Sequence, residues 1–151
     1  MPRPAKGRPR PRQQPQRRDL RNLLANPVAG AVYRRPPPAE RLLPQLAGEL
    51  LALQELAQSS AGPRAREDLR DMLLIVLELA RAGIGPELAG AAADALVLLR
   101  DLARCPPPWR LLGADLQMLV DLQAAHDAQR RMATEGELIE ANLRASRRAG
   151  S

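Results

Sequence analysis

The residues of this sequence with the clearest chemical capacity are the cationic side chains near its start. Seven of them precede the first acidic residue, Asp19. They are Arg3, Lys6, Arg8, Arg10, Arg12, Arg17 and Arg18. Arginine binds phosphate oxygens through paired hydrogen bonds, and each phosphate contact releases counterions from a nucleic acid. We therefore expect this segment to bind nucleic acid, DNA in preference to RNA.

The positive charge of the chain is concentrated in this first part. The 151 residues hold 23 Lys+Arg and 17 Asp+Glu, a net charge of +6. Residues 1–41 carry 11 of these cations and two acids, whereas residues 42–151 carry 12 and 15. Nine of the 15 prolines also lie in residues 1–41. We expect residues 1–38 to be a disordered basic arm and linker, in which residues 19–25 could form a short helix.

One short string in this arm has a recognisable pattern. Residues Lys6-Gly7-Arg8-Pro9-Arg10 resemble the AT-hook, a family of DNA-binding peptides in which basic residues flank a glycine that is followed by proline. The resemblance implies that Lys6 and Arg8 enter the narrow minor groove of A·T tracts, while Gly7 and Pro9 shape the turn. The chain departs from the family in having lysine first, where arginine is more common. Two other interpretations are a solvated tail and a polyproline ligand for a protein partner.

Other chemistries have few residues to support them. The chain has one histidine, His126, and one cysteine, Cys105, so it lacks the residues for a disulfide within the chain or a Cys/His zinc site. With no Phe, one Trp and one Tyr, it also lacks the aromatic platforms of base-stacking domains. We expect no enzyme activity, metal or cofactor. His126 is predicted at the surface or its boundary, Cys105 as a free thiol, and Trp109 as an anchor for the linker beside it.

The apolar residues after position 38 recur with a helical period, and we expect an all-α bundle over residues 39–148. Four main helices and one short terminal helix are predicted. Their approximate ranges are 40–58, 63–81, 86–104, 111–131 and 135–147. The last begins with a capping box, in which Thr134 and Glu137 satisfy each other's backbone N–H groups. The start of this helix is too acidic for the DNA-reading helix of a helix-turn-helix, so we interpret it as an ordinary capped helix.

Three faces of these helices lead to specific expectations. The first helix has one leucine-rich stripe that should face the core, made of Leu43, Leu46, Leu50, Leu53 and Ala57. Helix 63–81 is apolar around most of its circumference because Leu74, Ile75 and Leu79 widen its stripe. These three residues are predicted to form an interface in a homo-oligomer, unless the helix is simply central in a monomer. The fourth helix becomes polar after residue 125, where we expect it to leave the core.

Taken together, these features predict a non-enzymatic nucleic-acid-binding accessory or regulatory protein whose helical body presents an arginine-rich arm. The alternative is a helical protein-interaction or assembly module, with the arm as a solvated tail. No apolar run approaches the roughly 18 residues of a membrane span, and no apolar stretch follows the basic start. We therefore expect a cytoplasmic protein that does not enter membranes.

Overall fold

A computed structural model describes residue 31 and residues 33–151 of the chain. The chain divides into two units, Met1–Ala31 and Val32–Ser151, and all the described residues except residue 31 lie in the second. The nine arm residues predicted to bind nucleic acid, and the short helix predicted at 19–25, lie outside the described residues. The second unit includes residues 33–38, which the sequence predicts as the end of the disordered arm and linker; we call these six residues the strap.

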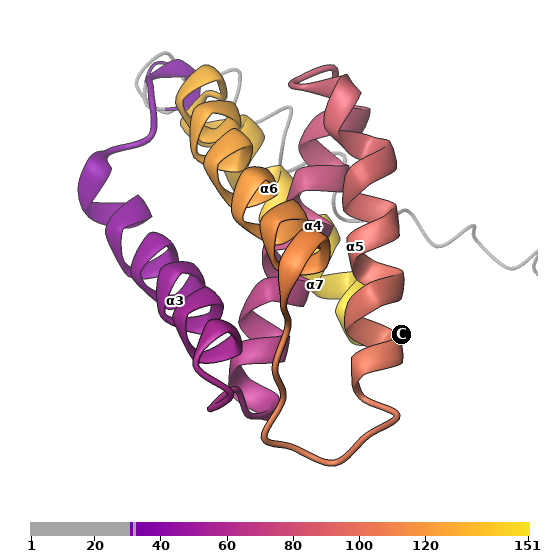
Figure 1. Ribbon diagram of the computed structural model, residues 1–151. Helices are drawn as coiled ribbons and strands as arrows, with labels where there is room; N and C mark the ends of the chain where they lie inside the picture. The colour runs from indigo at the N-terminus through magenta and orange to yellow at the C-terminus, as the bar shows by residue number, and fades with distance from the viewer. Residues whose placement is uncertain (1–30, 32) are drawn as a thin grey trace, which may run out of the picture. The chain divides into compact units, whose positions relative to one another are not determined.

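The second unit is all-α, as predicted (Figure 1). Its described residues form five α-helices and one short 3-10 helix. They are α3 (Ala39–Ala57), α4 (Pro63–Arg81), η1 (Pro86–Leu88), α5 (Ala89–Leu102), α6 (Gly113–Met132) and α7 (Glu135–Ala149). The helix ends follow local signals in the sequence. Pro63 is the first residue of α4, and Gly83 and Gly85 adopt the left-handed backbone that glycine tolerates best. None of the described helices is both long and apolar enough to cross a membrane.

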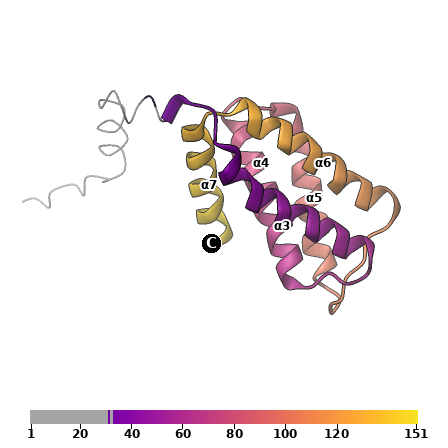
Figure 2. The same cartoon turned by 90° about the vertical axis from the view of Figure 1, so that its left-hand side faces the viewer.

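Helix α4 is the centre of this unit. It contacts α3, α5, α6, α7 and η1. Figure 1 and Figure 2 show it in the middle, with the other long helices around it. Three of its residues, Leu69, Leu73 and Val76, are fully buried. A helix that is apolar around most of its circumference needs neighbours on several sides, and α4 finds them within this chain.

The main core consists almost entirely of leucine and alanine side chains. Ala92 and Ala95 of α5 are fully buried against it, together with Leu99 one turn further on. Small side chains let α5 approach its neighbours closely, so the core fills without large aromatic residues. Trp109 closes the end of this core, and its indole N–H donates to the Cys105 carbonyl at 2.8 Å. The prediction that Trp109 anchors its linker is confirmed.

The predicted inward face of α3 was wrong in part. Leu53 is buried, but Leu43 and Leu50 are 59% and 49% exposed. The buried face contains Glu49 and Leu56 instead, because Glu49 forms an ion pair with α6 inside the bundle. Leucines surround much of α3, so their spacing alone does not determine which of them face inward.

The three predicted interface residues on α4 lie inside the chain. Leu79 is fully buried, Ile75 is 9% exposed and Leu74 is half-buried. All three pack in a second apolar cluster, to which α7 contributes Leu138 and Ala141. The wide apolar stripe of α4 is therefore covered by α7 of the same chain, and it need not bind a second copy.

Candidate functional site

The strap leads directly from the arm into α3, and it is bound to the first turns of α7. The ring of Tyr33 lies over Gly136, where a β-carbon would overlap the ring. The Tyr33 hydroxyl donates to Glu140 Oε1 at 2.7 Å. Burial and this carboxylate raise the pKa of Tyr33, so the hydroxyl keeps its proton. A glycine at position 136 is thus needed for the close approach of the strap.

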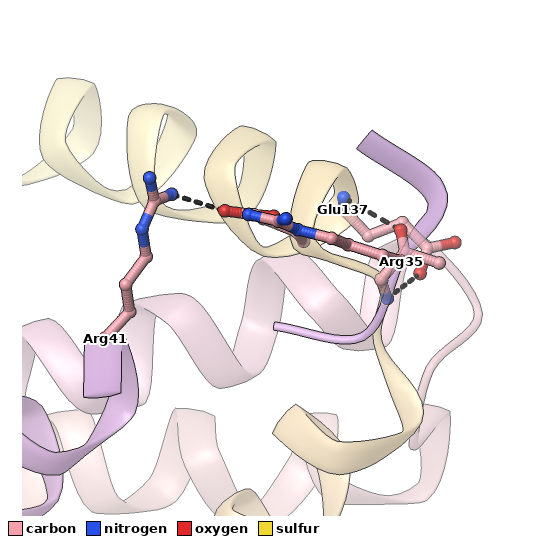
Figure 3. Close-up of polar contacts among 5 residues, drawn as sticks. Arg35, Arg41 and Glu137 are labelled. Carbon is pink, nitrogen blue, oxygen red and sulfur yellow. Dashed lines mark hydrogen bonds and ion pairs between the residues drawn. The ribbon is translucent and has the colours of Figure 1, made fainter. Parts of the chain in front are cut away.

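Two arginines meet one carboxylate beside this contact (Figure 3). Arg35, from the strap, donates from Nε to Glu135 Oε2 at 2.6 Å. Arg41, from the first turn of α3, places Nη1 2.5 Å from Glu135 Oε1. The backbone N–H of Glu135 also donates to the Arg35 carbonyl at 2.8 Å. Glu135 therefore holds the strap and the start of α3 together.

Glu135 is buried although it is charged. Its side chain is 4% exposed, whereas the side chains of Arg35 and Arg41 are 50% and 62% exposed. Hydrogen bonding to Arg35, with the nearby charges of Arg35 and Arg41, lowers the pKa of Glu135 below its ordinary value. As the first residue of α7, it also lies at the positive end of the helix dipole. These interactions keep the carboxylate ionised.

The capping box predicted at Thr134 is confirmed. The Glu137 backbone N–H donates to Thr134 Oγ1 at 3.2 Å, and the Thr134 N–H donates to Glu137 Oε2 at 2.8 Å. Figure 3 shows Glu137 next to the arginine contacts. The cap fixes the start of α7, and hence the position of Glu135, relative to the strap.

The C-terminal end of α7 repeats the arrangement with other residues. Glu78 of α4 is buried, with its side chain 3% exposed. Its Oε1 atom accepts from Arg81 at 2.8 Å and from Arg148 of α7 at 2.7 Å. Each end of α7 is thus held by a buried carboxylate between two half-exposed arginines.

A third buried carboxylate lies between α3 and α6. Glu49 pairs with Arg130, and their side chains are 6% and 1% exposed. The amide of Gln123 donates to the same carboxylate at 3.5 Å. Glu49, Gln123 and Arg130 are not among the residues predicted from the sequence to have a functional role. Helical spacing could have indicated that Gln123 and Arg130 are buried, because they lie on the same inward face of α6 as Leu119.

The prediction that His126 lies at the surface was wrong, because it is fully buried. Its Nδ1 lies 2.9 Å from Gln129 Oε1, while the Gln129 amide nitrogen donates to the carbonyls of Val76 and Ile84. Gln129 Oε1 must therefore accept, and Nδ1 carries the proton. Burial, together with the charge of Arg130, lowers the pKa of His126 to about 3, so the ring is neutral at pH 7. The polar end of α6 stays in the core, where Gln129 bonds to His126 and to two backbone carbonyls, while His126 Nε2 has no partner among the described residues.

Within the described residues, no group of three or more His, Cys, Asp or Glu side chains is placed to hold a metal ion. A hollow of about 490 Å³ between α5 and α6 is lined mainly by apolar residues, with Asp121 as its one carboxylate. Cys105 is exposed and free, as expected. Comparisons with protein-family models, curated proteins and solved structures found no match for this chain.

The charges of the described body nearly cancel. Residues 33–151 contain 15 arginines and 16 Asp+Glu, a net charge of −1. Ten of these arginines form ion pairs with carboxylates of the same unit. Residues 1–32 hold eight Lys+Arg and one acid, a net charge of +7. The excess positive charge of the chain therefore belongs to the segment before the strap.

Proposed function

We propose that this protein is a non-enzymatic nucleic-acid-binding accessory or regulatory protein, with its arm as the binding element. The observation that carries the proposal is the separation of charge. The body matches its arginines with carboxylates, whereas residues 1–32 carry a charge of +7 with one acid among them. A segment with that balance attracts the phosphate backbone whatever its conformation.

The anchoring of the strap adds to this proposal. The contacts of Tyr33 and Arg35 with α7 fix the point at which the arm joins the body. The arm can then reach along a nucleic acid while the body stays folded. If about six of its cations bind phosphates, a plot of log K for binding against log salt concentration should have a slope of roughly −5.

A salt titration of binding tests this function. The full chain is compared with a variant that lacks residues 1–18, on A·T-rich duplex, G·C-rich duplex and single-stranded RNA. The full chain should bind with a steep salt slope that the shortened variant loses. A control with Arg100→Gln and Arg104→Gln, which neutralises two exposed arginines of the body, should bind like the unmodified chain. Equal binding by the full and shortened chains would refute the arm as the binding element.

The AT-hook resemblance has its own test in the same assay. If the string at residues 6–10 reads the minor groove, Arg8→Ala should remove a preference for A·T-rich duplex. Arg12→Ala removes the same charge outside the string, and should weaken binding to all duplexes alike. If the two substitutions have equal effects, the string does not read the minor groove, and the arm binds phosphates without base preference.

A second candidate function is a helical protein-interaction module. The observation that favours it is the outer face of α3, where Leu43, Leu50 and Leu51 are about half exposed or more. Exposed leucines grouped on one helix are typical of surfaces that bind another protein. If self-association uses this face, light scattering should show an oligomer that Leu50→Glu converts to a monomer. A monomer at all concentrations would exclude binding between copies there.

A further inference from the structure

Three arginines lie in the strap and at the start of α3, soon after the arm in the sequence. Arg34 and Arg35 lie in the strap, and Arg41 lies in the first turn of α3. Arg34 is exposed, and the side chains of Arg35 and Arg41 are half exposed or more. In the chain these residues follow the arginine-rich arm after residues 22–33, which contain no cation, and they could extend the arm's contact with a phosphate backbone.

Two of the three are engaged by Glu135. This carboxylate accepts from Arg35 through one oxygen and contacts Arg41 through the other. A guanidinium group has five N–H donors. Arg35 uses Nε and Arg41 uses Nη1 to bind Glu135, and their remaining guanidinium N–H groups have no partner among residues 33–151. Their exposed sides therefore let an anion from solvent approach both guanidinium groups and compete with Glu135 for them.

We propose that Glu135 is an internal competitor that masks Arg35 and Arg41 from a nucleic-acid phosphate backbone. This inference rests on the proposed function and adds a regulatory contact to it. Phosphate and carboxylate oxygens seek the same guanidinium donors, so one arginine cannot serve both fully. When phosphates take these donors, the strap loosens its hold on α7.

The surroundings of Glu135 make such an exchange feasible. Water and salt reach the half-exposed arginines and weaken their pairing with the carboxylate. The Glu135 carboxylate keeps a favourable interaction without them, because it lies at the positive N-terminal end of α7. The Glu135 carboxylate is therefore still stabilised when phosphates bind Arg35 and Arg41.

The test is Glu135→Gln in the full chain, measured by fluorescence anisotropy with a short duplex DNA over a range of salt concentrations. The neutral amide cannot hold two guanidinium groups as the carboxylate does, so both become available to phosphate. The variant should bind DNA roughly three- to tenfold more tightly, with a salt slope steeper by about 1 to 2. Adding Arg35→Ala and Arg41→Ala to this variant should remove the gain.

The chain itself offers a matched control. Glu78 is also a buried carboxylate between two half-exposed arginines, at the far end of α7 from the strap. Glu78→Gln removes the same charge, yet it should leave DNA affinity and slope unchanged within about twofold. Circular dichroism melting curves would show that both variants remain folded.

The outcomes separate the two proposals. If the unmodified chain and Glu135→Gln both fail to bind DNA, the proposed function fails for DNA, and this inference fails with it. If the unmodified chain binds but Glu135→Gln leaves affinity and slope unchanged, the mask alone is refuted. An equal gain from Glu78→Gln would also refute it, because the effect would then be one of net charge and not of position.

Discussion

Replacing Glu49 by alanine should destabilise the protein strongly. The change leaves Arg130, whose side chain is 1% exposed, as a buried cation without its carboxylate. Removing one partner of a buried ion pair typically costs about 3–5 kcal/mol in the free energy of unfolding. Domains of this size have only about 5–15 kcal/mol in total. The variant should therefore lose a large share of its stability.

The assay is urea denaturation followed by circular dichroism. At a slope of about 1–3 kcal/mol per molar urea, this loss lowers the midpoint by roughly 1–5 M. Arg131→Ala is the control, since it breaks the α6 surface pair with Asp127 and its side chain is 75% exposed. That change should cost less than about 1 kcal/mol.

A double substitution tests the reasoning further. Glu49→Leu with Arg130→Met replaces both charges by apolar groups of similar size, so no buried charge is left. The double variant should recover to within about 1 kcal/mol of the unmodified protein. The reasoning is refuted if Glu49→Ala costs no more than the surface control, or if the double variant is less stable than Glu49→Ala.

Three further predictions concern α6 and α7. Gly136→Ala should push the Tyr33 ring from its place and cost about 1–3 kcal/mol of stability, a penalty that Tyr33→Ala in the same chain should remove. Thr134→Ala breaks the capping box and should lower the free energy of unfolding by about 1 kcal/mol, seen as a lower urea midpoint; Ser in its place should restore it. Because His126 has a pKa of about 3 when folded and about 6.5 when unfolded, the unfolded chain gains a proton first as pH falls. Stability should drop by about 2 kcal/mol between pH 7.5 and 5, and an unchanged drop in His126→Gln would contradict the assignment.

The helices could be predicted well because their signals are local. Pro63 begins α4, Gly83 and Gly85 form the turn that follows this helix, and Thr134 caps α7. Each signal acts through backbone groups within a few residues, so it needs no knowledge of the fold. The excess of positive charge before the strap could also be read directly from residue order.

The candidate site was harder to predict because its contacts join distant residues. Arg35 and Glu135 are 100 residues apart, and Tyr33 and Glu140 are 107 apart. The strap looked like a plain linker because proline and arginine are common in linkers. Its contacts with Glu135, Gly136 and Glu140 make it part of the body.

The sequence by itself determined an all-α body whose last helix starts with a capping box, and a chain whose excess of positive charge lies before residue 33. Tertiary structure alone decided which side of each helix is buried. Leu43 and Leu50 are exposed while Glu49 and His126 are inside, contrary to what hydrophobicity predicts. The physical reason is that a polar side chain can be buried once its partner is buried with it. Partners such as Glu49 and Arg130, 81 residues apart, meet only when the helices pack.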